Sequence, residues 1–397
     1  MRDPESELAD LDARQLRRRL KPLESPQGAN VTLAGRGLLN FSSNDYLGLA
    51  NHPALKQAFM DGISRFGAGA GASRLVSGSL AAHQALEEAL AAANQTAAAL
   101  LFSSGYAAAV GTLPALVGKG DVVLLDKLCH ASLIDGAKLS GATLRVFPHQ
   151  HLEKLERLLV SQRASLPAGS RLLIVTESVF SMDGDLAALR EIVALKEKHG
   201  ALLLLDEAHG FGVLGPSGMG LAEAFEVQGG VDIHMGTLSK SAGLAGGYVA
   251  ASRAFIDVLI NRARSFVFST ATPPALAHAG LTALELCRGG EGAARRGKLA
   301  ENRQALARAL GVATPPAGIV PIILGSAAAA LEASRALHAQ GFLVPAIRFP
   351  TVPLGAARLR VTLTADHAPQ EVAALAAALA VFCENPAGRG SCDKASS

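Results

Sequence analysis

Short apolar stretches alternate with helix-like stretches between about residues 80 and 280, and this alternation limits the possible folds most strongly. The apolar runs are AALLF (98–102), DVVLLD (121–126), RLLIVTE (171–177) and ALLLLDE (201–207). Runs of this length and composition suit strands that are buried on both faces of a parallel sheet. The helix-like stretches between them supply the crossovers that parallel strands need. The sequence therefore predicts an α/β fold with a large, mainly parallel sheet.

The two ends of the chain differ from this middle region. Leucines at roughly helical spacing predict a helix over about residues 4–20. A charged helix-like stretch (287–310), strand-like pieces and a final Ala-rich helix predict a small α+β lobe after about residue 285. A chain of 397 residues also exceeds the usual size of one domain. We therefore expect an N-terminal helix and arm (1–45), a large α/β domain (46–284), a small C-terminal α+β domain (285–386) and a disordered tail (387–397).

Charge and composition exclude several classes of partner. The net charge of +3 is too small to indicate nucleic-acid binding. The four cysteines form no CxxC pair, so we expect reduced thiols and no metal site. The N-terminus lacks the apolar core of a signal peptide, and no uninterrupted apolar run reaches the ~18 residues of a membrane span. The sequence predicts a soluble, cytoplasmic protein that does not bind membranes.

A lysine stands in a turn rich in small residues, within DIHMGTLSKSAGLAGGYV (232–249). A lysine can form an imine at neutral pH if burial and a nearby cation lower its pKa. Small neighbours would allow a flat ring to approach Lys240, and Thr237 and Ser239 offer hydroxyls for a phosphate. Taken alone, the motif is equally compatible with a surface lysine in a loop.

The run LLLLDEAHG (202–210) places Asp206 at the end of a predicted strand and His209 three residues later. A buried carboxylate at this place could keep a pyridine nitrogen protonated, and His209 could hydrogen-bond a phenolic oxygen. The same letters occur in nucleotide-hydrolysing helicases, but that interpretation needs a GxxxxGK[ST] loop, which the chain lacks. Glu207 should point to the opposite side of the strand, so we interpret it as structural.

Three further predicted strand ends carry weaker signals. Gly105 and Tyr106 follow one strand where a helix begins, which is a favourable place for a phosphate. His130 and Ser181 follow two other strands and could reach a ligand there. Ligands of open α/β sheets gather at the carboxyl ends of the strands. Each of these residues also has an ordinary structural interpretation.

Taken together and in this order, these stretches resemble the α-oxoamine synthases. The resemblance extends from Leu16 to His367 of this chain. These enzymes are fold-type I pyridoxal 5′-phosphate (PLP) transferases of the aminotransferase-like class. The resemblance implies a seven-stranded sheet domain, a small C-terminal α+β domain, and PLP held as a Schiff base on Lys240. It assigns catalytic roles to Lys240, His130, Asp206 and His209. The implied cofactor-binding residues are Gly105, Tyr106, His130, Ser181, Asp206, His209, Thr237, Lys240, Ser269 and Thr270.

The resemblance also implies a homodimer with shared active sites. Ser269 and Thr270 match a segment that reaches the phosphate from the other subunit. Arg360 matches the arginine that binds the amino-acid carboxylate, a task for which its planar guanidinium is suited. Ser241 and Met219 depart from the usual pattern, where Ala and Arg are commoner, which affects fine specificity rather than class.

Within the family, three stretches most resemble the branch that joins L-alanine to a pimeloyl thioester in biotin synthesis. They are LRRR (16–19), NFSSNDYLGL (40–49) and AIRFPTVPLGAARLRVTLTADH (346–367). The acyl carrier would be coenzyme A or acyl carrier protein. Sister activities that use glycine and a short acyl-CoA, and a non-catalytic PLP-binding protein, are the alternatives. The implied substrate-binding residues are Arg17, Asn44, His130, Thr351 and Arg360. Arg17 and Arg348 are the candidates for binding the pimeloyl carboxylate.

Overall fold

The computed structural model describes residues 3–383, which divide into two compact units. Unit 1 contains the residues up to Gly48, Met182–Asp185 and the residues from Gly297 onward. Unit 2 contains Leu49–Ser181 and Leu186–Arg296. The domain limits expected from the sequence stay a prediction, and the expected tail (387–397) lies outside the described residues.

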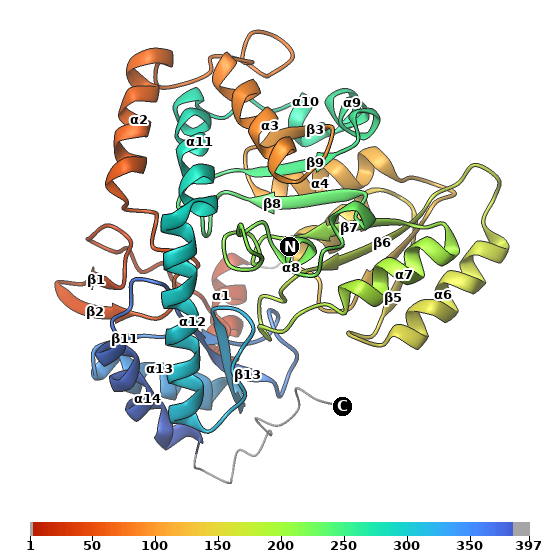
Figure 1. The fold of residues 1–397 in the computed structure, drawn as a ribbon. Coiled ribbons are helices and arrows are strands. Elements are labelled where there is room, and N and C mark those ends of the chain that lie inside the picture. Colours follow the sequence, from red (N-terminus) through yellow and green to blue (C-terminus); the bar gives the residue numbers. More distant parts are fainter. Residues whose placement is uncertain (1–2, 384–397) are drawn as a thin grey trace. The chain divides into compact units, whose positions relative to one another are not determined.

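Unit 2 is built on a seven-stranded sheet with the order β3-β9-β8-β7-β6-β4-β5 (Figure 1). Strand β9 is antiparallel to both of its neighbours, and the other neighbouring pairs are parallel. The strands are β3 (Ala98–Phe102), β4 (Val122–Asp126), β5 (Thr143–Phe147), β6 (Leu172–Glu177), β7 (Leu202–Asp206), β8 (Ile233–Thr237) and β9 (Gly247–Ala251). The predicted large, mainly parallel seven-stranded sheet is confirmed.

Both faces of this sheet are buried under helices. Leu173 and Val175 of β6 belong to the core that includes side chains of α4 (Gly105–Leu116), α5 (Ala131–Leu139) and α9 (Arg253–Arg262). Leu172 and Ile174 belong to the opposite core, formed with α6 (Leu152–Ser165) and α7 (Leu189–His199). All four side chains are at most 2% exposed. Each such burial stabilises the fold by about 1.5–3 kcal/mol, which explains the uniformly apolar strand sequences.

Further helices complete unit 2, and two of them approach closely at a glycine. The further helices are α2 (Pro53–Phe66), α3 (Ala81–Ala93) and α11 (Pro274–Arg288), with the short α8 (Leu221–Ala224), η1 (Gln228–Gly230) and α10 (Arg264–Val267). A Cβ added at Gly62 of α2 would lie 2.8 Å from Cα of Ala275 in α11. Only glycine therefore allows these two helices to approach as they do. Helix α12 (Gly290–Leu310) begins in unit 2 and ends in unit 1.

Unit 1 contains two small sheets and several helices. The antiparallel sheet β10-β13-β12 consists of Ile319–Gly325, Ala357–Thr362 and Ala346–Ile347. The second sheet, β1-β2-β11, consists of Asn30–Leu33, Arg36–Asn40 and Phe342–Leu343. The remaining helices are α1 (Pro4–Ala13), α13 (Ala327–Ala339) and α14 (Pro369–Cys383). No helix among residues 3–383 combines the length and apolarity needed to cross a bilayer.

The N-terminal helix is shorter than its leucine spacing predicts. It ends at Ala13 rather than near residue 20, because Gln15 adopts a left-handed conformation with φ of 56°. The Leu16 amide then donates to the Leu11 carbonyl at 2.7 Å, a bond that closes the end of a helix. Arg17 therefore lies in irregular chain instead of on a helix face.

Candidate functional site

The sheet register brings the predicted strand ends of unit 2 to one edge. Glu177 at the end of β6 pairs with Asp206 at the end of β7, and Asp206 pairs with Met235 in β8. Across β9, Gly247 pairs with both Thr237 of β8 and Phe102 of β3. The loops that follow β3, β6, β7 and β8 therefore start side by side, as ligand sites of open α/β sheets require.

Lys240, Asp206 and His130 influence one another electrostatically at this edge. Burial raises the pKa of Asp206, and the nearby Lys240 ammonium opposes that rise. Burial lowers the pKa of His130, and Lys240 lowers it further. The Asp206 side chain also accepts a hydrogen bond from the Ala208 amide at 2.8 Å, which fixes its direction. An amine, a buried carboxylate and an imidazole that favours its neutral form thus lie in one cluster.

Glu177 adds a second buried carboxyl that sequence reasoning did not assign to the site. It is 3% exposed and accepts a hydrogen bond from the backbone amide of His130. Burial, followed by the charge of Asp206, raises its pKa to about 8. His130 caps α5, and Glu177 thereby fixes the backbone that presents the imidazole. The available signal was a charged residue that ends an otherwise apolar strand.

Hydroxyls and a helix start gather near the end of β8. Thr237 Oγ1 lies 2.7 Å from Ser239 Oγ and donates to the Gly246 carbonyl at 2.7 Å. A Cβ added at Gly105 would lie 3.5 Å from Thr237 Cβ, so the loop after β3 approaches Thr237. Ser104 caps α4 by accepting from the Ala107 amide at 3.0 Å. A helix N-terminus beside hydroxyls is a favourable place for a phosphate.

The other predicted residues of unit 2 occupy several environments. His209 is 5% exposed in the turn after β7, and Ser181 is half-buried in the loop after β6. Tyr106 is 49% exposed, and its hydroxyl donates to Asp135 at 2.8 Å. Ser269 and Thr270 lie in the separate segment after α10, where Thr270 forms a β-bridge with Ser73. These two residues thus belong to another cluster of unit 2, described below.

Unit 1 brings Arg360 and Asn44 together. Arg360 on β13 is 6% exposed and donates to Asn44 Oδ1 at 3.1 Å. Burial raises the pKa of Tyr46 to about 12, although the Arg360 guanidinium beside it acts in the opposite direction. Two residues earlier on the strand, Arg358 bonds to Asp183 at 2.7 Å, an ion pair the sequence did not indicate.

Further substrate-binding candidates of unit 1, Arg17, Arg348 and Thr351, also lie in one region of that unit. Arg348 Nη2 donates to the Arg17 carbonyl at 3.0 Å, and Arg17 pairs with Asp12 at 2.6 Å. The neighbouring Arg18 donates to Thr351 Oγ1 at 3.0 Å. The structure therefore joins the LRRR stretch to the loop after β12, although 331 positions separate Arg17 from Arg348.

The two departures from the family pattern are both buried. Ser241 is 0% exposed, and the Cys287 thiol donates to its carbonyl at 3.8 Å. Met219 is 4% exposed, and its amide donates to Glu223 at 2.9 Å. Neither side chain forms part of the strand-end cluster described above.

The chemistry of the unit 2 cluster fits PLP. Lys240 provides an amine, Asp206 provides a buried carboxylate, and Thr237 and Ser239 provide hydroxyls beside the start of α4. A phosphate, a pyridine nitrogen and an aldehyde each have a suitable partner in this set.

Comparison with known proteins settles the family. Residues 36–379 match the model of aminotransferase class I and II. The chain belongs to this family. Two relatives named 8-amino-7-oxononanoate synthase, from Geobacter sulfurreducens and Anaeromyxobacter dehalogenans, are each 50% identical. The matches cover 94% and 96% of this chain, respectively, and 96% of each relative.

Solved structures similar to this chain agree with this assignment. A serine palmitoyltransferase from S. paucimobilis, with a PLP–myriocin aldimine bound, superposes with a TM-score of 0.89 and 30% identity. The match covers 96% of this chain and 98% of that one. An 8-amino-7-oxononanoate synthase from Francisella tularensis superposes with a TM-score of 0.73 and 28% identity. That match covers 87% of this chain and 97% of the solved one. The predicted fold class and the resemblance to α-oxoamine synthases are confirmed.

Proposed function

We propose that this protein is a PLP-dependent 8-amino-7-oxononanoate synthase. It condenses L-alanine with a pimeloyl thioester and releases 8-amino-7-oxononanoate, CO2 and the free thiol carrier, a step of biotin synthesis. The observation that carries the proposal is about 50% identity over more than nine-tenths of the chain to curated relatives of that name. The strand-end cluster of Lys240, Asp206 and His130 supplies the chemistry that this reaction needs.

Lys240 is the proposed attachment point of PLP and the base that moves the α-proton of alanine. When bound, PLP withdraws electrons from the α-carbon of the amino acid. Asp206 holds a proton on the pyridine nitrogen, a task that its burial and its fixed direction suit. His209 is the proposed partner of the phenolic oxygen, and His130 is the proposed cover of the cofactor ring. Lys240 takes up the proton and later returns one to the product.

Phosphate binding is assigned to Gly105, Thr237 and the start of α4. The approach of the Gly105 loop to Thr237 supports this placement. Tyr106 and Ser181 are proposed to contact the cofactor at the same edge of the sheet. Ser269 and Thr270 are proposed to reach the phosphate of a second subunit, so the proposal includes a homodimer with shared active sites.

Substrate binding is assigned to residues of unit 1. Arg360 is the proposed partner of the alanine carboxylate, with Asn44 holding the guanidinium by the bond described above. Arg17, Arg348 and Thr351 are proposed to bind the pimeloyl chain, and their proximity supports a common role. A cytoplasmic location completes the proposal.

A panel of amines and thioesters tests the proposed reaction. The holoenzyme is given L-alanine, glycine or L-serine with pimeloyl-CoA, pimeloyl-acyl carrier protein, acetyl-CoA, succinyl-CoA or palmitoyl-CoA, and free thiol and CO2 are measured. We expect the highest kcat/KM with L-alanine and one of the pimeloyl thioesters. Serine is included because serine palmitoyltransferases superpose well on this chain.

The panel distinguishes the alternatives. Turnover only with glycine and a short acyl-CoA would indicate a sister enzyme of the α-oxoamine synthase family. PLP binding without turnover of any pair would favour a non-catalytic PLP-binding protein. Either result would contradict the proposed function.

A further inference from the structure

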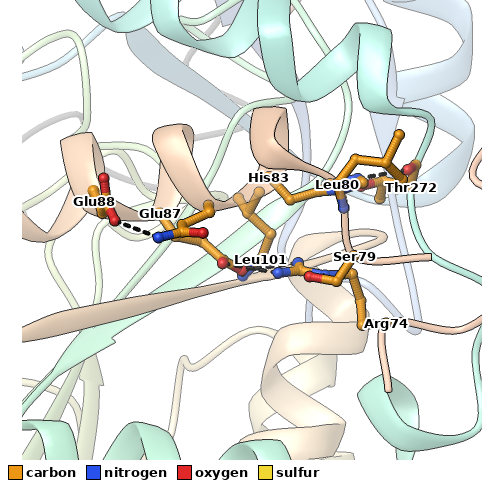
Figure 2. Close-up of polar contacts among 9 residues, drawn as sticks. Arg74, Ser79, Leu80, His83, Glu87, Glu88, Leu101 and Thr272 are labelled. Carbon is orange, nitrogen blue, oxygen red and sulfur yellow. Dashed lines mark hydrogen bonds and ion pairs between the residues drawn. The ribbon is translucent and has the colours of Figure 1, made fainter. Parts of the chain in front are cut away.

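Two side chains of α3 hold the segment that contains Thr270. His83 and Glu87 lie four residues apart, so they share one face of the helix (Figure 2). His83 is 0% exposed, and the Glu87 side chain is 13% exposed. Buried polar groups persist only where hydrogen bonds satisfy them, so the partners of these two residues define what they do.

Glu87 fixes the loop that precedes α3. Its carboxylate binds the Arg74 guanidinium with both oxygens, at 2.9 and 2.8 Å, and accepts from the Leu101 amide at 2.9 Å. Arg74 in turn donates to Ser79 at 3.2 Å and lies 5.6 Å from the Phe266 ring centroid. A bidentate pair of this kind sets both the distance and the direction of the loop.

His83 fixes the segment after α10. Its Nδ1 accepts from the Leu80 amide at 3.1 Å, so the ring proton of the neutral form lies on Nε2. Nε2 then donates to the Thr272 carbonyl at 2.8 Å, across 189 positions of sequence (Figure 2). Protonated His83 would present a second N–H to the Leu80 N–H. Only the neutral imidazole can therefore make both bonds.

The loop and the segment are also joined directly. Ser73 and Thr270 form an antiparallel bridge, and the Ala271 amide donates to the Ala72 carbonyl at 3.0 Å. Ser269 and Thr270 line a cavity of about 20 Å³, together with Arg74 and Ser103. Ser103 directly follows β3. The position of Thr270 thus depends on the loop that precedes α3 and on the segment after α10, and side chains of α3 hold both.

We propose that His83, with the Arg74–Glu87 pair, is a positioning residue that holds Thr270 where it reaches the cofactor phosphate of the second subunit. This proposal rests on the proposed PLP-dependent function. His83 acts through the Thr272 carbonyl on one side of Thr270, and Arg74 acts through the loop that bridges Thr270 on the other side. Charges near His83 are those of Arg74 and Glu87, which oppose each other in their effects on its pKa.

Two substitutions separate the positioning bond from the local helix cap. His83→Asn keeps an acceptor at the place of Nδ1 for the Leu80 amide and removes the donor to Thr272. His83→Gln keeps a donor at the place of Nε2 and removes the cap. The dissociation constant of PLP is measured for each apoprotein by absorbance titration, at a temperature where circular dichroism shows it folded. Glu88→Gln, on the exposed side of the same helix, is the control.

We expect His83→Asn to weaken PLP binding about tenfold, roughly the factor that one hydrogen bond is worth. His83→Gln and Glu88→Gln should stay within about twofold of the unsubstituted protein, since each keeps the Thr272 bond. In a Thr270→Ala background, His83→Asn should cost little further affinity, because its effect passes through Thr270. The proposal would be overturned if His83→Asn weakened PLP binding by the same factor in the Thr270→Ala background as it does alone. Unchanged PLP binding by His83→Asn alone would also overturn it.

Hydrogen exchange of the apoprotein gives a readout that does not depend on PLP. The Ala271 amide, bonded to Ala72, should exchange faster in His83→Asn than in Glu88→Gln. Equal exchange in the two variants would also overturn the proposal. Absence of PLP binding by the unsubstituted protein would instead contradict the proposed function, so the two failures are distinguishable.

Discussion

Glu207 is buried beside the site but accepts hydrogen bonds from the backbone instead of facing the cluster. Its two oxygens accept from the Leu221 and Ala222 amides at 3.0 and 2.9 Å, where α8 begins. Burial nevertheless raises its pKa to about 7. A Cβ at Gly220, which has φ of +108°, would come within 2.2 Å of this carboxyl. Glu207 and Gly220 therefore fix the turn after β7 together.

Replacing Glu207 by Gln should destabilise the fold by about 1–3 kcal/mol, because the amide NH2 would face a backbone N–H. The free energy of unfolding in urea, measured at pH 8.5 where the Glu207 carboxyl is ionised, checks this. Glu177→Gln is the matched control. Among the described residues, the Glu177 carboxyl accepts a hydrogen bond from one backbone amide, that of His130. Equal stability of Glu207→Gln and the unsubstituted protein would show that the paired acceptors are unimportant.

The site residues that could be predicted are those that follow strands within a few positions. Asp206 ends strand β7 and Lys240 follows strand β8 by three positions, so local pattern and family motifs indicated both residues as candidates. Glu177 also ends a recognisable strand, but its bond to the His130 amide, 47 positions away, could not be predicted. The roles of His83 and Arg74 depend on partners 189 and 13 positions away, and no local pattern encodes those distances.

At the scale of elements, α3 is attached to its surroundings by charge as well as by packing. The side chains of Arg74 and Glu87 are only 10% and 13% exposed. Removal of one member of a buried pair leaves the other charge without compensation and typically costs about 3–5 kcal/mol. Exposure of this degree places the expected effect at the low end of that range.

Arg74→Met should lower the free energy of unfolding by about 3 kcal/mol. Adding Glu87→Gln should restore part of that loss, because the remaining carboxylate disappears while the Gln oxygen still accepts from Leu101. Urea unfolding of the two single variants and the double variant measures the coupling. A double variant less stable than Arg74→Met would contradict the assigned role of the ion pair.

Strand prediction succeeded where burial on both faces left a continuous apolar run. Strand β5 was missed, because its sequence TLRVF lies at the sheet edge and only Phe147 is buried. Strand β9 was missed because it follows a Gly-rich stretch, although all of its residues are buried. Edge strands and Gly-rich strands lack the composition by which a buried strand is recognised.

At the scale of the whole molecule, stability should depend on the pH through buried histidines. His234 on β8 is 3% exposed, and burial lowers its pKa to about 4. The unfolded chain therefore binds a proton at higher pH than the folded chain does. The free energy of unfolding that depends on neutral His234 is fully present above about pH 6.5. It is lost as the pH falls toward 4.

His234→Gln should abolish this part of the pH dependence, since Gln does not titrate and can still donate to the Gln228 carbonyl. Between pH 6.5 and 4 the unsubstituted protein should lose about 3 kcal/mol relative to the variant. Chemical unfolding at several pH values checks this difference. Glu177 and Glu207 act in the opposite direction, because their raised pKa values cost stability as the pH rises above about 4.5. Parallel pH profiles of the two proteins would contradict the assignment to His234.

We propose that Lys240 forms the imine with PLP, and borohydride reduction tests this assignment most directly. Reduction converts the imine to a stable secondary amine, and peptide mass spectrometry then identifies the modified lysine. We predict a single pyridoxyl-modified peptide, which contains Lys240, and its absence from Lys240→Ala. Modification of a different lysine, or of none after incubation with PLP, would contradict the account.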